Sequence, residues 1–132
     1  LEKKLIIDAA DIPDLVPILA VTAACNQGAV FTNIGRLRLK ESDRVESVKE
    51  MIIALGGTAE SDAETLTVQG IGLQGGTVDA RNDHRIAMSA AIAATACRED
   101  VIILGAQCVE KSYPRFFEEY RKLGGRYEQY LR

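Results

Sequence analysis

The chain of 132 residues is long enough for one domain with a buried core, and its composition, 47% hydrophobic and 27% charged, is ordinary for a globular protein. Its formal net charge of −3 argues against a general nucleic-acid binder, because such proteins depend on clustered lysine and arginine side chains. No apolar run approaches the roughly 20 residues of a membrane-spanning helix and no signal peptide is visible, so we expect no membrane partner.

The first half of the chain alternates between strand-like and helix-like patterns. Pro13 suits the first turn of a helix, because its missing N–H removes no hydrogen bond there. Apolar residues from Val45 to Leu55 recur at helical spacing before a Gly-Gly pair, which predicts a second helix. The expected elements are a strand at 5–7, a helix at about 13–25, a strand at 29–34, a helix at about 44–55, and strands at 58–60 and 65–68.

A charged run, Leu39-Lys40-Glu41-Ser42-Asp43-Arg44, leads into that second helix. Asp43 suits the N-cap, which puts Arg44 in the first turn, where free backbone N–H groups and the helix dipole favour an anion. Lys40 and Glu41 come just before the cap and can reach the same point in space. The run is therefore either a site for a phosphorylated, carboxylated substrate or an ordinary solvated helix start, and charge spacing alone does not decide between them.

The second half of the chain repeats the same order of predicted strands and helices. Glycines between 70 and 76 mark turns, and an alanine-rich stretch predicts a helix that is buried on most sides. The expected elements are a strand at 77–80, a helix at 86–97, a strand at 101–104, a helix introduced by Tyr113-Pro114 that ends at Gly124-Gly125, and a last strand at 126–130.

This order indicates an internal repeat of about 70 residues. The matching segments are Asp8-Ala9-Ala10 with Asp79-Ala80-Arg81, Cys25 with Cys97, and Leu55-Gly56-Gly57 with Leu123-Gly124-Gly125. Strands that alternate with helices predict an α/β fold with right-handed crossovers. A repeat also brings equivalent helix starts together, and four charged positions lie at or just before such starts: Asp14, Arg44, Arg85 and the segment 111–114.

Four short motifs stand out along this chain: Ile12-Pro13-Asp14, Leu39-Lys40-Glu41-Ser42-Asp43-Arg44, Asn82-Asp83-His84-Arg85-Ile86-Ala87-Met88 and Cys108-Val109-Glu110-Lys111-Ser112-Tyr113-Pro114. They resemble the signatures of the 3-phosphoshikimate 1-carboxyvinyltransferase (EPSP synthase) family. They follow the family order and together cover essentially the whole chain, which makes the resemblance highly specific.

The resemblance implies a two-domain enzyme in which each domain contains three βαβαββ units, with helices packed on mixed parallel and antiparallel sheets. About two units are visible here, repeat unit one at about 1–70 and repeat unit two at about 71–132. We therefore expect residues 1–132 to form a single-domain fragment from the C-terminal part of an enolpyruvyl transferase, with the other domain absent. A first residue that is Leu1 rather than methionine agrees with a fragment or a processed chain.

The family reaction, as the resemblance implies it, moves the enolpyruvyl group of phosphoenolpyruvate to the 5-hydroxyl of shikimate 3-phosphate and releases phosphate. The reaction belongs to the shikimate pathway of aromatic amino acid biosynthesis and needs no cofactor. It passes through a tetrahedral intermediate, so it requires a base for the hydroxyl, an acid for the donor's methylene carbon, and cations for the donor's carboxylate and phosphate.

The resemblance also assigns roles to single residues. Asp14 matches an aspartate that contacts the 5-hydroxyl and is proposed as its base, although without the resemblance the sequence favours a helix-capping carboxylate. Lys40 matches a lysine near the same hydroxyl. Glu41 and Lys111 match candidates for proton transfer to the donor, and Lys111 also contacts it. Two arginines that clamp phosphoenolpyruvate match Arg44 and Arg85, and forked guanidinium groups suit such an anion.

His84, the single histidine, allows two interpretations: a structural hydrogen bond or a direct contact in the active site. With one histidine, dispersed thiols and no carboxylates at ligand spacing, the sequence predicts no metal site. Cys25, Cys97 and Cys108 form no CxxC pair and are typical of reduced thiols in a cytoplasmic protein.

Two alternatives and one departure from the family pattern bear on function. The chain can also be a fragment of the related transferase that acts on UDP-N-acetylglucosamine, against which its motifs argue, or a non-catalytic anion-binding α/β module. Arg36 stands where some family members carry an asparagine that serves the acceptor, so it is not among the candidate site residues. With half of the cleft missing, we expect this chain alone to fold without turning over substrate.

Overall fold

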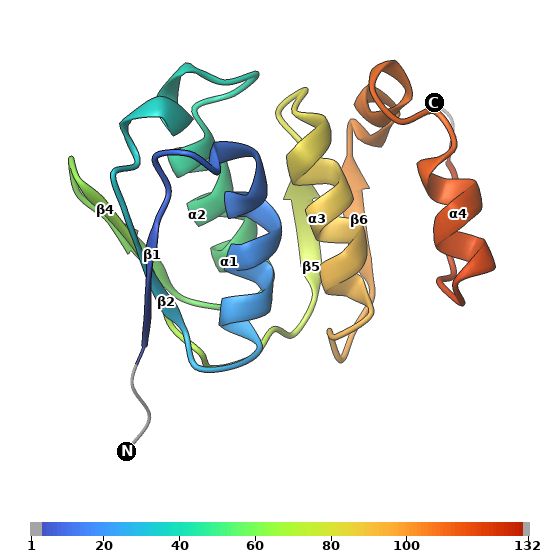
Figure 1. Cartoon of the computed structure of the whole chain (residues 1–132). Helices are drawn as coiled ribbons and strands as arrows, with labels where there is room; N and C mark the ends of the chain where they lie inside the picture. Colours follow the sequence, from blue (N-terminus) through green and yellow to red (C-terminus); the bar gives the residue numbers. More distant parts are fainter. Residues whose placement is uncertain (1–3, 131–132) are drawn as a thin grey trace.

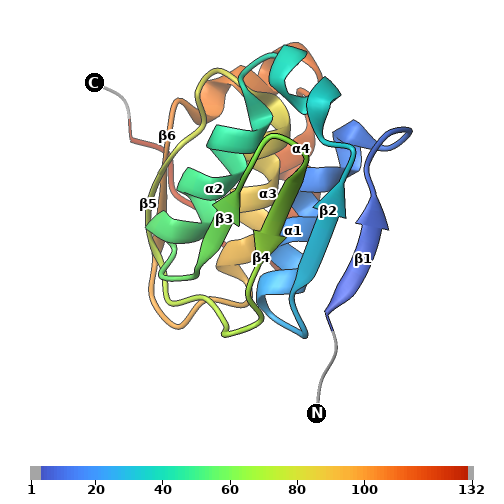
Figure 2. The same ribbon diagram turned by 90° about the vertical axis from the view of Figure 1, so that its left-hand side faces the viewer.

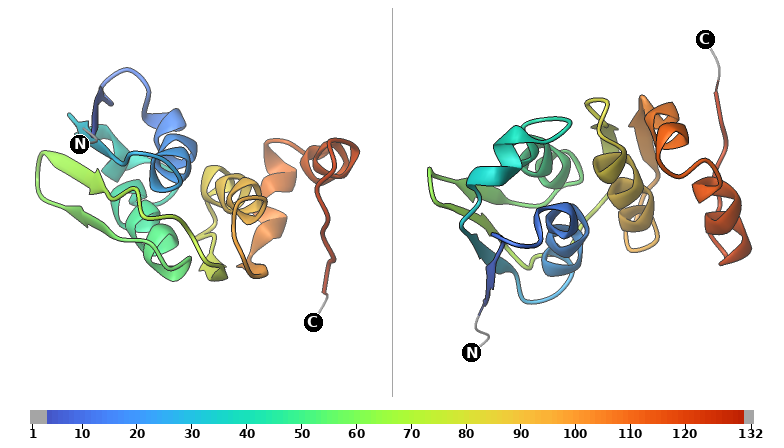
Figure 3. Two further views of the ribbon diagram at one scale, coloured as in Figure 1. Left: turned by 90° about the horizontal axis from the view of Figure 1, so that it is seen from below. Right: turned by 45° about the horizontal axis from the view of Figure 1, so that its top comes forward.

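Two sheets lie on either side of a group of three helices in the computed structural model, which describes residues 4–130 (Figure 1). Helices α1, α2 and α3 contact one another in this group, and each also packs against strands. The two views in Figure 3 show the four-stranded sheet at one side of these helices and the second strand pair with α4 at the other. The fold is α/β, as the alternation of patterns predicts. No helix in the described part of the chain is long and apolar enough to cross a membrane.

The first half of the chain, called the first repeat, forms a mixed sheet with the strand order β1-β2-β4-β3. Strands β1 and β2 run parallel, and β2–β4 and β4–β3 pair antiparallel, as the implied βαβαββ unit requires. Figure 2 shows this sheet in front of its helices. Its elements are β1 (Leu5–Asp8), the 3₁₀ turn Pro13–Leu15, α1 (Val16–Ala24), β2 (Ala29–Thr32), the 3₁₀ segment Gly35–Leu39, α2 (Arg44–Ala54), β3 (Ala59–Ser61) and β4 (Thr65–Val68).

The second half, called the second repeat, contains a parallel pair of strands, β5 and β6. Between them runs α3, which is rich in alanine and buries most of its faces, as expected. Its elements are β5 (Gly76–Asp79), α3 (His84–Ala94), β6 (Val101–Leu104), the 3₁₀ segment Ala106–Lys111 and α4 (Phe116–Lys122).

The two repeats share local geometry where their sequences match. After β1, the Asp8 carboxylate accepts a hydrogen bond from the N–H of Ala10 at 2.9 Å, and after β5 the Asp79 carboxylate accepts one from the N–H of Arg81 at the same distance. The ends of α2 and α4 agree as well. There Gly56 and Gly124 adopt positive φ angles of 92° and 104°, which close a helix at little steric cost for glycine.

Two predicted helix starts differ from the structure for local reasons. The predicted helix at 13–25 starts as a 3₁₀ turn and becomes α-helical only at Val16, which leaves Pro17 in the first turn, where proline is tolerated. The predicted helix at 86–97 starts earlier, at His84, because the Asp83 side chain caps it by accepting a hydrogen bond from the N–H of Arg85.

The strand expected at 126–130 is wrong, because those residues have no regular secondary structure. A strand needs a neighbour for its backbone hydrogen bonds, whereas this segment lies against α4. The ring of Tyr127 packs 5.1 Å from that of Phe117 and beneath the guanidinium of Arg121, 4.3 Å from ring to Cζ. The second repeat therefore ends in a helix and an irregular tail within the described residues.

The core between sheet and helices is built from apolar side chains at their expected periodicities. Phe31, Leu66, Ile52 and Ile86 are all fully buried in one cluster that spans both repeats. The largest side chain with no exposed surface is, however, a charged one, Arg44. A buried cation must have partners close by, because an unpaired charge in the interior is very costly.

Candidate active site

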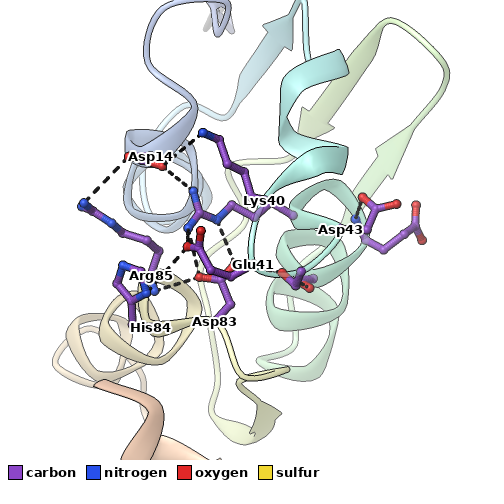
Figure 4. A network of polar contacts seen from close by, with 11 residues as sticks. Asp14, Lys40, Glu41, Asp43, Asp83, His84 and Arg85 are labelled. Atoms are coloured by element: carbon purple, nitrogen blue, oxygen red, sulfur yellow. Dashed lines mark hydrogen bonds and ion pairs between the residues drawn. The ribbon is translucent and has the colours of Figure 1, made fainter. Parts of the chain in front are cut away.

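Three helix starts meet at the end of the molecule where the parallel strands finish. Asp14 lies in the 3₁₀ turn before α1, Lys40 and Glu41 precede α2, and Arg85 lies in the first turn of α3. The connections that follow β1 and β5 are short, whereas the one from β2 to α2 is longer and includes the 3₁₀ segment Gly35–Leu39. The repeated order of strand and helix brings the three starts to one end of the molecule (Figure 3). Figure 4 shows the side chains of Asp14, Lys40, Glu41 and Arg85 pointing toward one another.

Arg44, the first residue of α2, is the centre of this group and has no exposed surface. Its Nη1 donates a hydrogen bond to Asp14 Oδ1 at 2.6 Å, and its Nη2 donates to Glu41 Oε2 at 2.6 Å. On its other edge, Nε and Nη2 donate to the two carboxylate oxygens of Asp83 at 2.8 and 3.1 Å. Three carboxylates from three segments therefore surround one guanidinium.

These contacts fix the charge states of the buried groups. Burial opposes ionisation of Arg44, but its hydrogen bonds to Asp83 and Asp14 outweigh burial and raise its pKa above the ordinary value. Burial likewise opposes ionisation of Asp83, yet the hydrogen bonds from Arg44 and Ser42 outweigh it and lower the pKa of Asp83. The pair is therefore ionised at neutral pH.

Asp14 faces three cations. Besides its bond to Arg44, its carboxylate lies 4.0 Å from Lys40 Nζ and 3.9 Å from Arg85 Nη2. The hydrogen bond from Arg44 lowers the pKa of Asp14 below its ordinary value of 3.8, against the opposing effect of burial. Asp14 is thus an exposed carboxylate that stays ionised at neutral pH, and in the described structure its side chain makes no capping hydrogen bond at the turn Pro13–Leu15 or at α1.

Arg85 retains unused donor capacity. Its side chain is 39% exposed, and its Nε is buried without a hydrogen-bond partner among residues 4–130. A partly exposed guanidinium with a free donor beside Lys40 and Arg44 is suited to bind an anion that enters from solvent.

His84 lies at the edge of the group, with Nδ1 3.7 Å from Glu41 Oε2. The ligand atoms of Glu41, Asp83 and His84 come within 4.8 Å of one another, a grouping that the sequence did not predict. Arg44 donates to both carboxylates of this trio, so its positive charge already occupies the place that a metal ion would need. The chemistry of these donors therefore suits an ion-pair network better than a metal site.

Lys111 is not part of this network in the described structure. It ends the 3₁₀ segment after β6 and is exposed. Together with Asn82, Gly105, Gln107 and Cys108 it lines a hollow of about 360 Å³ beside the start of α3. Lys111 therefore lies near the group but forms no ion pair with it. Arg36 has a structural contact, because its Nη1 donates to the carbonyl oxygen of Ala10 at 3.2 Å.

Sequence reasoning missed two residues of the network, Asp83 and Ser42. Ser42 donates its hydroxyl hydrogen to Asp83 Oδ2 at 2.9 Å and accepts a bond from the Ser47 hydroxyl at the same distance. The available signal was the position of Asp83, an aspartate just before a helical pattern, like Asp43 before α2. The expected helix start at residue 86 concealed that equivalence.

Comparisons with known proteins show the family. A family model described as EPSP synthase (3-phosphoshikimate 1-carboxyvinyltransferase) matches residues 2–120. A 3-phosphoshikimate 1-carboxyvinyltransferase of Clostridium acetobutylicum is 46% identical over 123 residues, covering 92% of this chain and 29% of that protein. The enzyme of the same name from Clostridioides difficile is 38% identical over 128 residues, covering 95% of this chain and 29% of its own length. The chain therefore spans a little under a third of these curated relatives.

Solved structures give the same result for the fold. An EPSP synthase from Acinetobacter baumannii superimposes with a TM-score of 0.79 at 25% sequence identity, covering 88% of this chain and 28% of that one. A second structure of EPSP synthase from that organism gives a TM-score of 0.78 at 28% identity, covering 83% of this chain and 27% of the other.

Proposed function

This chain belongs to the EPSP synthase (3-phosphoshikimate 1-carboxyvinyltransferase) family, and we propose that it supplies the donor-binding part of a transferase active site. The reaction moves the enolpyruvyl group of phosphoenolpyruvate to the 5-hydroxyl of shikimate 3-phosphate and releases phosphate. The observation that carries the proposal is the convergence of Asp14, Arg44 and Arg85 at three helix starts. That arrangement combines a proton acceptor with cations for a phosphate and a carboxylate.

Arg44 and Arg85 bind the donor anion in this proposal. Their guanidinium groups approach the same carboxylate, Asp14, from two helices, so an anion at that point meets both. Lys40, whose Nζ is 4.0 Å from the same carboxylate, adds a third positive charge near the reacting hydroxyl. Fixed charges that are already in place stabilise a transition state without reorganising during the reaction.

The chemical step then needs two proton transfers. Asp14 takes the proton of the 5-hydroxyl as that oxygen bonds to C2 of phosphoenolpyruvate, while Glu41 or Lys111 gives a proton to C3. Loss of a C3 proton and of phosphate from the tetrahedral intermediate restores the double bond. His84, 3.7 Å from Glu41, is placed to contact the donor or to orient Glu41.

The rest of the acceptor site belongs, in this proposal, to another domain of a longer cytoplasmic protein. Residues 1–132 then form a fragment of one domain, with repeat units at about 1–70 and 71–132. Relatives named 3-phosphoshikimate 1-carboxyvinyltransferase support this function over transfer to UDP-N-acetylglucosamine and over a non-catalytic anion-binding module.

A chimaera tests the proposal directly. This chain replaces the matched segment of the Clostridium acetobutylicum relative, and phosphate release is measured with phosphoenolpyruvate and each acceptor. We expect release with shikimate 3-phosphate, none above background with UDP-N-acetylglucosamine, and none from the isolated 132-residue chain, which lacks one wall of the cleft. A folded chimaera that is inactive with shikimate 3-phosphate, or robust turnover by the isolated chain, contradicts the proposal.

A further inference from the structure

Asp83 is the one fully buried carboxylate among the described residues, and both of its oxygens are used twice. Oδ2 accepts hydrogen bonds from Arg44 Nε at 2.8 Å and from the Ser42 hydroxyl at 2.9 Å. Oδ1 accepts from Arg44 Nη2 at 3.1 Å and from the backbone N–H of Arg85 at 3.0 Å. This single side chain therefore joins the start of α2 to the start of α3.

Capping α3 does not require these contacts. A cap needs one side-chain oxygen for a free backbone N–H, and asparagine supplies it about as well as aspartate. Asp43, the equivalent cap of α2, does this from an exposed position, accepting one bond from the N–H of Glu46 at 3.4 Å. The charge of Asp83 and its burial thus need a second explanation, and Arg44 provides it.

The three carboxylates around Arg44 fall into two kinds. The side chains of Asp14 and Glu41, which cover Nη1 and Nη2, are 52% and 46% exposed. Asp83 instead accepts hydrogen bonds from Nε and Nη2, the other edge of the Arg44 guanidinium, and its side chain has no exposed surface. Asp14 and Glu41 can turn toward solvent when an anion arrives, whereas Asp83 has no such freedom.

We propose that Asp83 is a positioning residue, which holds Arg44 by its Nε edge so that the Nη1–Nη2 edge remains directed at the entering anion. Asp14 and Glu41 occupy that edge in the unliganded site, and the anion takes their place. The bidentate contact fixes the plane of the guanidinium, which a single hydrogen bond would leave free to rotate. That the anion is phosphoenolpyruvate rests on the proposed function, but the hold of Asp83 on Arg44 does not.

A double-mutant cycle in the 132-residue chain tests this hold through urea unfolding. In the parent background, Asp83→Asn leaves a buried cation without its main partner, and we expect the unfolding equilibrium constant to rise by about 100-fold. In the Arg44→Met background the same substitution removes a buried carboxylate that has lost its partner, so it should stabilise. A residue that only caps α3 predicts little change in either background.

One further measurement needs no variant and so does not depend on whether a variant folds. In the unsubstituted chain, the Arg44 Nε–H should exchange with solvent far more slowly than that of Arg38, whose guanidinium contacts exposed Asp43 at 3.4 Å. Equal exchange rates, or the same sign of stability change in both backgrounds, would overturn the proposal.

Anion binding supplies the functional readout, with inorganic phosphate and phosphoenolpyruvate as probes in NMR titrations. We expect Asp83→Asn to weaken phosphoenolpyruvate affinity by about tenfold, while the matched cap variant Asp43→Asn leaves it unchanged. If folded Asp83→Asn binds as tightly as the parent chain, Asp83 does not position Arg44. If the parent chain binds neither anion, the proposed donor site fails, and the unfolding cycle still decides whether Asp83 holds Arg44.

Discussion

The two repeats follow one plan of strand, helix and strand but begin their helices with residues of different kinds. Where α2 begins with the buried cation Arg44, α4 begins with Phe116, a buried aromatic side chain that is 9% exposed. Asp14 in the first repeat and Arg85 in the second stand at the same distance along the chain after Asp8 and Asp79, and they carry opposite charges 3.9 Å apart. The repeat therefore fixes where the helix starts meet, and the residue types decide which helix start lines the charged site and which packs into the apolar core.

The largest expected effect concerns Asp14, the acidic member of the equivalent pair. In the active chimaera, Asp14→Ala should lower kcat by about 100- to 10,000-fold, because the hydroxyl loses its base. The effect on either KM should be much smaller, since the base acts mainly as the proton leaves. Steady-state kinetics measure both constants, and circular dichroism verifies the fold. Near-normal kcat in a folded variant would contradict the assignment of Asp14 as the base.

Phe116 tests the other side of the comparison. It packs with Val109 and Ala87 in a small cluster of the second repeat, so Phe116→Ala should reduce the free energy of unfolding by about 3 kcal/mol. Urea denaturation of the chain measures the loss, and Leu123→Ala, at a site 89% exposed just after the same helix, is the control with little change. A large loss of phosphoenolpyruvate affinity in folded Phe116→Ala would contradict the division between packing and chemistry.

Arg85, the basic member of the equivalent pair, should act mainly in binding. In the chimaera, Arg85→Ala should raise the KM for phosphoenolpyruvate by about tenfold with a smaller fall in kcat, because charge-assisted bonds to the donor exist already in the ground state. Arg81→Ala is the matched control. The Arg81 guanidinium pairs with Glu50, with 2.6 Å between Nη2 and Oε1, and not with the residues around Arg44. An unchanged KM in the Arg85 variant places the donor elsewhere.

Acid should have the smallest of these effects, and it should act through the carboxylates around Arg44. Folded-state pKa values of Asp14 and Asp83 lie below their ordinary value of 3.8, mainly because of Arg44 in the first case and despite burial in the second. Their contribution to stability is therefore complete above that ordinary value and is lost as pH falls from about 4 through the folded-state pKa values. Urea unfolding at a series of pH values should show a shallower loss in Arg44→Met than in the parent chain. Parallel curves would mean that Arg44 does not lower these pKa values.

Much of this architecture follows from local sequence signals. The run from Val45 to Leu55 and its cap Asp43 predict α2 nearly residue by residue, because periodicity and capping act over a few residues. Asp14, Lys40, Arg44 and Arg85 were likewise expected at helix starts, where the structure brings them together.

The remainder depends on contacts between distant segments. Nothing near Asp83 in the sequence shows that its partner is Arg44, 39 positions away, or that both lose all exposure to solvent. The prediction of a strand at 126–130 was wrong for the same kind of reason, since this segment packs against α4 through Tyr127 and Phe117 and does not pair with a strand edge. Lys111 remained outside the network because its contacts depend on how the segment after β6 turns, which short motifs do not encode.

The buried ion pair between Arg44 and Asp83 also means that the two repeats must evolve together. Arg44 comes from one copy of the repeat and Asp83 from the other. A recombinant that joins the first copy from one family member to the second from another receives half of the pair from each parent. If either parent has drifted at its half, the hybrid buries a lone charge even though every backbone element still fits. A crossover between β4 and β5 therefore keeps every backbone element intact but can separate the two charges of the pair. Positions 44 and 83 should change together or not at all.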